Sequence, residues 1–375
     1  MRISFVGDIM LGRFVGEKFS QTNYQIVSSE IVDKLKQSDY VIANLESPII
    51  DSQTESEDDH LRFLGDSAIL EQFDWVDCFS LSNNHINDCG TIGMNQTISA
   101  LNSYNLSWNG LYKEEYVPFL IEEQNCKIAV ITCTDLMNIE FSENCLWKTL
   151  RVGDSYIDNI IKKYNEQGYF IALYAHVGML FTRFPSPAIR DYLHSKVDLG
   201  VDLIVTVHSH ALGGMEEYNG VPIFHSLGDF IMDGNSFRRR QNYILNVEIE
   251  RNKIKSWDII PTIIDVELRT VIPNDKAQKK MRQSFQLVSS KLDKHREDYS
   301  DFYKVQYKKE MLAHSLSTLH FIFKTKGIIG MFRLLYVRIF DVFGMIGRVF
   351  KDKSKMRYDV GVVSSKRKMS NKSIK

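Results

Sequence analysis

Short apolar runs alternate with longer amphipathic stretches over the first 265 residues of the chain. The runs with the length and composition of buried strands are 3–6, 40–43, 78–81, 128–132, 171–175 and 203–207. Apolar residues at helical spacing fill several gaps between them, at 26–36, 155–164 and 186–199. This alternation predicts an α/β fold built from layers of helices and strands.

The pattern changes toward the end of the chain. Segments 243–250 and 253–265 are typical of a closing antiparallel pair, with Arg251-Asn252 at the turn. Polar, helix-favouring sequence follows over 276–310, and residues 351–375 are rich in Lys and Ser without sustained periodicity. We therefore expect an α/β domain over 1–265, a helical extension over 266–350, and a disordered basic tail over 351–375.

Composition supports a globular body and sets the tail apart. Of 375 residues, 44% are hydrophobic and 25% are charged, which argues against wholesale disorder. The overall net charge of −1 hides an asymmetry, because residues 324–375 hold 14 basic and 3 acidic residues. A tail of this charge favours an anionic partner, namely a membrane surface, a nucleic acid or a polyanion.

Cysteine usage and the N-terminus indicate a cytoplasmic protein. The five cysteines are odd in number and show no CxxC spacing, so we expect reduced thiols rather than a zinc knuckle or a disulfide framework. The first apolar run is too short for a signal peptide, and no run is long enough for a transmembrane helix without charges.

Polar residues able to bind a metal follow nearly every predicted strand. They are Asp8, Asn44 and Glu46, the group Asn83-Asn84-His85 with Asp88, then His176, and finally His208-Ser209-His210. Each has an ordinary explanation by itself, such as a turn, a helix cap or a core histidine. Because the carboxyl ends of strands share one edge of an α/β sheet, we expect these side chains to meet there.

The two histidines His208 and His210 carry the strongest signal. If the strand continues through them, residues i and i+2 point to the same side, and both imidazoles can address one centre. Imidazole, carboxylate and amide ligands suit Mn, Fe, Zn or Ni. We expect two such ions, which together would clamp a phosphoryl group and activate a water.

These motifs occur in an order and spacing that resembles a known family. The matching segments are Gly7-Asp8-Ile9-Met10-Leu11-Gly12, Asn44-Leu45-Glu46, Asn83-Asn84-His85, His176-Val177-Gly178, His208-Ser209-His210 and the closing stretch 220–230. Together they resemble the bacterial CapA/PgsA capsule (poly-γ-glutamate) synthesis family, which is similar to calcineurin-like metallophosphoesterases. The resemblance covers about residues 1–233 and implies a four-layer α/β/β/α sandwich.

The resemblance also implies roles for individual residues. The implied metal ligands are Asp8, Glu46, Asn84, His176, His208 and His210. His85 would be a catalytic acid or phosphate-contacting group, and we add Asp229 as a catalytic candidate. The candidate substrate-binding residues are Asn44, Asn83 and Asp88.

The sequence departs from the family pattern at three places. The carboxylate that the family carries after the His176 motif is missing, since Met179 and Leu180 stand there. The middle residue of the His-x-His motif is Ser209 where Pro is common, and Asp229 replaces the expected Asn. These changes predict either altered substrate choice or weakened catalysis.

The segment 319–350 is apolar on one side and basic on the other. A helix packed on the body explains this pattern, and so does an interfacial helix on the anionic inner face of the membrane. A partner protein or polymer, such as a synthase subunit, is a third explanation. The interfacial helix, together with the basic tail, would make the protein peripheral at the membrane.

The leading functional hypothesis is a metal-dependent hydrolase of the phosphoesterase type in capsule, exopolysaccharide or poly-γ-glutamate biosynthesis. Its substrate would be a phosphate ester, or an amide, of a capsule or polysaccharide precursor. The alternative is a non-catalytic, metal-binding scaffold of a polymer synthase complex. Nucleic-acid processing ranks below both, because the basic tail lacks interleaved aromatic residues for base stacking beyond Tyr358.

Overall fold

The computed structural model describes residues 1–50, 65–123, 126–135, 137–234, 236–295 and 297–349. Contacts divide the chain into a first unit, Met1–Phe321, and a second, Ile322–Lys375. The predicted basic tail, 351–375, lies outside the described residues, as do most side chains of the amphipathic segment 319–350. No helix in the described part of the chain combines the length and the apolar character needed to cross a membrane.

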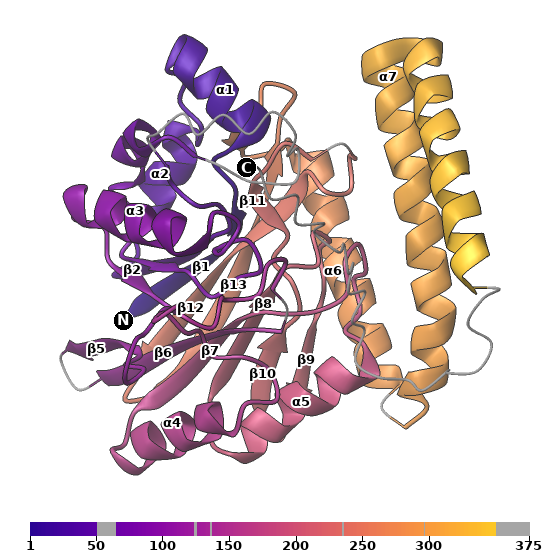
Figure 1. The fold of residues 1–375 in the computed structure, drawn as a ribbon. Coiled ribbons are helices and arrows are strands. Elements are labelled where there is room, and N and C mark those ends of the chain that lie inside the picture. Colours follow the sequence, from indigo (N-terminus) through magenta and orange to yellow (C-terminus); the bar gives the residue numbers. More distant parts are fainter. Residues whose placement is uncertain (51–64, 124–125, 136, 235, 296, 350–375) are drawn as a thin grey trace. The chain divides into compact units, whose positions relative to one another are not determined.

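The first unit contains two β-sheets (Figure 1). The larger sheet has the order β14-β13-β12-β1-β2-β3-β4, with β11 paired to β1. Its strands are β1 (Arg2–Ile9), β2 (Tyr40–Leu45), β3 (Cys78–Ser80), β4 (Trp108–Asn109), β11 (Asp229–Ile231), β12 (Gln241–Glu250), β13 (Lys253–Ile264) and β14 (Thr270–Val271). Strands β1 to β4 run parallel, and β12 and β13 close the sheet as the predicted antiparallel pair.

The second sheet has the order β5-β6-β7-β8-β10-β9. Its strands are β5 (Phe119–Glu123), β6 (Cys126–Thr134), β7 (Phe170–His176), β8 (Leu203–Val207), β9 (Met215–Tyr218) and β10 (Val221–Phe224). Strands β6, β7, β8 and β10 are parallel, so their carboxyl ends lie along one edge.

Helices cover the outer face of each sheet (Figure 1). The larger sheet packs against α1 (Arg13–Thr22), α2 (Ser29–Leu35) and α3 (Gly90–Ser103), with the short helix η1 (Ser67–Phe73) nearby. The second sheet packs against α4 (Ser155–Glu166) and α5 (Pro187–Asp198). Helix α4 begins at the predicted residue and α5 one residue later than predicted, and the side chains of Asp154 and Ser186 cap their first turns.

Alternation along the strands builds the layers. In β6, Ile128 and Val130 face the larger sheet, whereas Ala129 and Ile131 face α4 and α5. Ile3 and Phe5 of β1 meet Ile128 and Val130 in the layer between the sheets. The expected α/β/β/α sandwich is therefore confirmed.

Two further helices follow the sandwich. The first, α6 (Asp275–Lys294), packs its buried face near β9 and β13. The second, α7 (Tyr299–Val349), is interrupted at Gly327, where φ is 65° and ψ is −168°. The part of α7 that belongs to the first unit contacts the body through Tyr299 and Phe302, which join Phe184 in a small buried cluster.

Candidate metal centre

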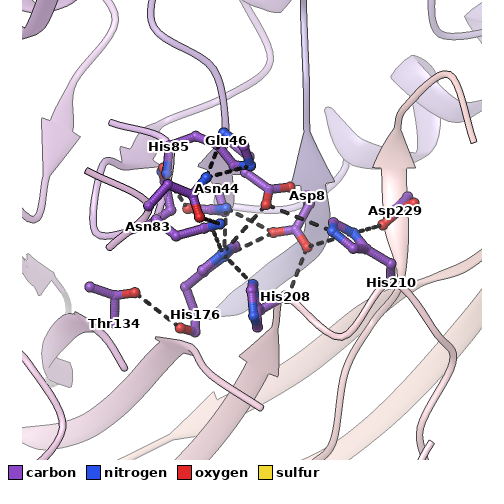
Figure 2. Close-up of polar contacts among 12 residues, drawn as sticks. Asp8, Asn44, Glu46, Asn83, His85, Thr134, His176, His208, His210 and Asp229 are labelled. Atoms are coloured by element: carbon purple, nitrogen blue, oxygen red, sulfur yellow. Dashed lines mark hydrogen bonds and ion pairs between the residues drawn. The ribbon is translucent and has the colours of Figure 1, made fainter. Parts of the chain in front are cut away.

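The strand ends that carry the predicted site residues meet in one place, but they come from both sheets. The larger sheet supplies residues from β1, β2 and the loop after β3, and the second sheet supplies them from β7 and the loop after β8. The six predicted ligands all lie buried at this junction: Asp8, Glu46, Asn84, His176, His208 and His210. Figure 2 shows Asp8, Glu46 and the three histidines pointing toward one another.

Asp8 is positioned by tight backbone packing around β1. A side chain on the preceding Gly7 would place its Cβ only 1.8 Å from the carbonyl oxygen of Gly228, so only glycine allows this approach. The fully buried carboxylate of Asp8 accepts hydrogen bonds from the amide of Asn44 at 2.7 Å and from the backbone N–H of His208 at 2.9 Å. These two hydrogen bonds hold both carboxylate oxygens of Asp8 in a defined orientation.

The convergence of His208 and His210 has a different cause from the one expected. Strand β8 ends at Val207, as predicted, so neither histidine lies on a strand and the expectation that strand alternation points both to one side is wrong. His208 and His210 instead adopt positive φ angles of 96° and 51° in the following loop. Non-glycine residues occupy such conformations at an energetic cost, and they cluster at functional sites. A strained loop, not a strand, brings the two imidazoles to the centre.

One set of candidate ligands, here called the Glu46 group, consists of Glu46, His176 and His208. Nε2 of His176 lies 2.9 Å from Nδ1 of His208 and 3.5 Å from Oε1 of Glu46. Neither carboxylate oxygen of Glu46 takes a hydrogen bond from any residue that the structure describes, and the same is true of Nε2 of His208. Buried polar atoms are rarely left in this state unless an ion or water satisfies them.

The second set, the Asp8 group, consists of Asp8, His210 and Asp229. Nδ1 of His210 lies 2.6 Å from Oδ1 of Asp229 and 4.0 Å from Oδ2 of Asp8. Nε2 of His210 is also 4.0 Å from Oε1 of Glu46, so the two groups adjoin. The structure thus places Asp229, a catalytic candidate, among residues able to hold a metal.

The segment after β3 brings Asn84 and His85 to the same centre. Oδ1 of Asn84 lies 2.8 Å from Nε2 of His176. His85 is buried, and its Nδ1 lies 2.7 Å from Oδ2 of Asp88. A carboxylate in this position fixes the tautomer and orientation of the imidazole.

The candidate substrate-binding residues lie inside the network. Asn44 is fully buried, and its amide lies 3.1 Å from Nδ1 of His176 as well as donating to Asp8. Asn83, also fully buried, donates to the side chain of Asn44 and to the carbonyl of Leu45. These contacts orient the ligands, while a contact of Asn44, Asn83 or Asp88 with substrate stays a prediction.

Burial and mutual repulsion shape the protonation of the centre. Burial would raise the pKa of Asp8, but His176 and His210 hold that pKa below its ordinary value. Burial, then the neighbouring Asp8 and Asp229, raise the pKa of Glu46 well above its usual range. Burial also lowers the pKa of His176 and, more strongly, that of His208. Neutral imidazoles are the form that binds metals, and a bound cation would relieve the repulsion among the carboxylates.

Three residues near the centre escape the sequence analysis. The side-chain nitrogen of Asn138 lies 3.2 Å from Nδ1 of His85, and its oxygen accepts from the amide of Asn84 at 3.0 Å. Asp135 accepts from the backbone of Gly178 at 2.9 Å, and Arg239 lies 3.6 Å from Asp229. Asn138 and Asp135 follow β6, so the strand-end rule could have found them. No comparable signal marks Arg239.

The structure also shows where the residues that depart from the family pattern lie. Leu180, at the end of the stretch where the family carries a carboxylate, is 40% exposed. Met179 instead lines a small cavity together with Arg183, Ser209 and His225. Ser209 is buried and donates to the carbonyl of Ala211.

Comparison with known proteins agrees with these motifs. The family described as "Bacterial capsule synthesis protein PGA_cap" matches residues 2–234, which is more than half of the chain. This chain belongs to that family. It is 27% identical over 288 residues to the PGA biosynthesis protein CapA of Bacillus subtilis (strain 168), covering 74% of this chain and 75% of that protein. It is 25% identical over 281 residues to the capsule biosynthesis protein CapA of Bacillus anthracis, covering 70% and 67%.

Solved structures show weaker likenesses. A hypothetical protein from Thermus thermophilus is 12% identical, with a TM-score of 0.43, covering 70% of this chain and 98% of that one. The Thermus thermophilus sulfate thiohydrolase SoxB, in complex with glycerol, is 10% identical with a TM-score of 0.38, covering 65% and 42%. These values are too low to bear on function.

Proposed function

We propose that this PGA_cap family member is a metal-dependent hydrolase of phosphate esters in capsule polymer biosynthesis. The observation that supports it best is the pair of adjoining ligand groups, all of whose members are buried. The unsatisfied oxygens of Glu46 and of Asp229 are those that a bound cation would satisfy. The donor set of imidazole, carboxylate and amide fits a borderline transition metal.

Each side chain then has a role. The Glu46 group, with Asn84, would hold one ion, and the Asp8 group would hold the other. Divalent ions bound there would supply an activated water and stabilise negative charge on a phosphoryl group. Asn44 and Asn83 keep Asp8 and His176 in place through the hydrogen bonds described above.

His85 would donate a proton to the leaving oxygen of the substrate. Asp88, which contacts Nδ1 of the ring, would orient the imidazole for this transfer, and Nε2 lies 3.3 Å from the side-chain nitrogen of Asn138. The relatives named above are a PGA biosynthesis protein and a capsule biosynthesis protein. We therefore place the substrate among phosphate-containing precursors of such a polymer.

The test combines metal analysis with hydrolysis. Purified protein is expected to contain up to two transition-metal ions per chain and to cleave p-nitrophenyl phosphate or bis(p-nitrophenyl) phosphate. Asp8→Ala and His208→Ala should lose both properties, whereas His320→Ala, an exposed residue on α7, should keep them. Unchanged metal content in both site variants would refute the site, and bound metal without hydrolysis of either ester would refute the reaction.

One observation favours a scaffold instead of an enzyme. The carboxylate that the family carries near residue 180 is replaced by the partly exposed Leu180. A scaffold would bind metal for stability and hold polymer or synthase subunits without turnover. Capsule production that persists in an Asp8→Ala, His210→Ala strain would support this alternative.

A further inference from the structure

The centre holds several carboxylates, and one arginine lies close to them in the described part of the chain. Asp8, Glu46 and Asp229 are all fully buried and belong to the two adjoining groups. Among the described residues, Arg239 is the one arginine or lysine with its charged head within 4.0 Å of any of these three carboxylates. Its guanidinium therefore lies at the border of the proposed active site.

The guanidinium group of Arg239 is close to the centre but makes no short hydrogen bond to its carboxylates. Its nearest nitrogen is 3.6 Å from Oδ2 of Asp229, which exceeds hydrogen-bond distance. Its Nε and this Oδ2 both lack hydrogen-bond partners among the described residues, although the side chain is only 14% exposed. A buried guanidinium with an unused donor is suited to bind an incoming acceptor.

An aromatic platform supports this guanidinium. It lies 5.4 Å from the centre of the Phe181 ring. Phe181 in turn stacks on His314 of α7, with ring centres 3.9 Å apart, and its other neighbour is His210 at 6.3 Å. Phe181 has a positive φ of 65°, so the loop after β7 is strained to place the ring between α7 and the metal centre.

The neighbouring arginines are already occupied, unlike Arg239. Arg183 and Arg238 both bind the buried carboxylate of Glu310 on α7. Both arginines thus tie α7 to the two loops that flank the centre, and Arg183 also donates to Ser284 on α6. Arg238 and Arg239 are adjacent in sequence but serve different partners, which provides a matched pair for experiment.

We propose that Arg239 binds the anionic phosphoryl group of the substrate at the metal centre. This inference rests on the proposed function. With two divalent ions bound and all three carboxylates ionised beside them, the carboxylates, Arg239 and the ions would sum to a charge of +2, which suits a phosphate ester. Arginine presents paired N–H donors that match two phosphoryl oxygens, and its planar group can also contact an aromatic ring such as that of Phe181.

Arg239 has a simpler alternative role as the counterion of Asp229. In that case replacement of Arg239 would lower the metal content and the stability of the fold. The same replacement would have no effect in a protein that already carries Asp229→Asn. Substrate binding predicts the opposite pattern, in which phosphate affinity falls while metal content stays the same. The two roles can therefore be separated by measurements that do not depend on turnover.

The experiment titrates inorganic phosphate into the protein as purified, by calorimetry, after its metal content has been measured. Arg239→Gln should weaken phosphate binding by about 10- to 100-fold, since hydrogen bonds to charged groups contribute about 1.5–3 kcal/mol. Arg239→Lys should recover part of this loss, and Arg238→Gln should bind phosphate as the wild type does. Metal content should be equal in all four proteins, and KM for an aryl phosphate should rise in Arg239→Gln more than kcat falls.

Each other outcome overturns a different statement. Phosphate binding that is unchanged in Arg239→Gln refutes the inference. The inference is also refuted if Arg239→Gln loses metal and the double variant Arg239→Gln, Asp229→Asn regains it. Phosphate binding that depends on Arg239, without hydrolysis of any phosphate ester by the wild type, leaves the inference standing and refutes the proposed function.

Discussion

Asp8 and Asp229 are register partners in the parallel pairing of β1 with β11, and the imidazole of His210 lies against both. Nδ1 of His210 is 2.6 Å from Asp229 and 4.0 Å from Asp8. Strand β11 is only three residues long, Asp229–Ile231, and its pairing with β1 sets the carboxylate of Asp229 beside Asp8. At this position the family pattern leads one to expect an amide.

Replacement of Asp229 separates its charge from its hydrogen bond. Asp229→Asn keeps an oxygen that accepts from His210, so we expect metal affinity within about tenfold of the wild type. Asp229→Ala removes the acceptor and leaves His210 unoriented, and metal affinity should fall by about 10- to 100-fold. Competition with a chromophoric chelator measures both values. Equal affinity in the Ala and Asn variants would show that the hydrogen bond does not orient His210.

The close approach of Gly7 to Gly228 makes a second prediction. Because a Cβ on Gly7 would lie 1.8 Å from a backbone oxygen, Gly7→Ala must push β1 and β11 apart. We expect a loss of about 3 kcal/mol in unfolding free energy and a lowered metal content. Denaturant unfolding and elemental analysis measure the two effects.

Gly220→Ala is the matched control for Gly7→Ala. Gly220 has a positive φ of 80°, but no atom lies within 4 Å of its would-be Cβ. Its replacement should cost about 1 kcal/mol from backbone strain and leave metal content unchanged. A Gly7→Ala protein no less stable than this control would contradict the packing argument.

The fold could be predicted from the sequence where hydrophobic pattern and turn chemistry agree. The six predicted strands all form, and the Arg251-Asn252 turn joins β12 and β13 with positive φ at both residues, as a tight hairpin requires. Short elements have too few residues to show a hydrophobic pattern. Helix α1 and strand β11 depend on neighbours distant in sequence, such as the pairing of β11 with β1.

The candidate site could be predicted from the polar residues at strand ends, since parallel strands gather those ends whichever sheet they belong to. The geometry of His208 and His210 could not be predicted, because positive φ angles in a loop produce no periodic pattern in the sequence. The position of Arg239 could not be predicted either. It lies in the loop between β11 and β12, and only the folded chain brings it to Asp229.

The contact of α7 with Arg183 and Arg238 predicts a pH dependence. Burial would raise the pKa of Glu310, but the two arginines hold that pKa below its ordinary value of 4.5. At pH near 4.5 the unfolded chain therefore binds more protons at this residue than the folded chain does. The stabilising contribution of Glu310 is present above this pH and is lost as the pH falls through the lowered folded-state pKa.

Glu310→Gln tests this contribution. At pH 7 the variant should be less stable than the wild type by about 1.5–3 kcal/mol, because two partly buried guanidinium groups lose their charged partner. The difference should shrink progressively below about pH 4.5. Thermal unfolding from pH 7 to pH 3 measures it, with Asp74→Asn, in the exposed Lys36–Asp74 pair, as the control. A difference independent of pH would show that the ion pair contributes nothing.

His85 and Asp88 provide the sharpest test of the proposed chemistry, because they adjoin the ligands without belonging to either metal group. His85→Ala should retain metal and lower kcat for a phosphate ester by about 10²- to 10⁴-fold, the usual contribution of a general acid. A leaving group that needs no proton, such as p-nitrophenol, should show a smaller loss than an alkyl alcohol does. Asp88→Asn should lower kcat less than His85→Ala does, since the amide oxygen can still accept a hydrogen bond from the ring and hold it in place. An equal loss for both leaving groups would remove His85 from the role of acid and leave it as a group that positions the substrate.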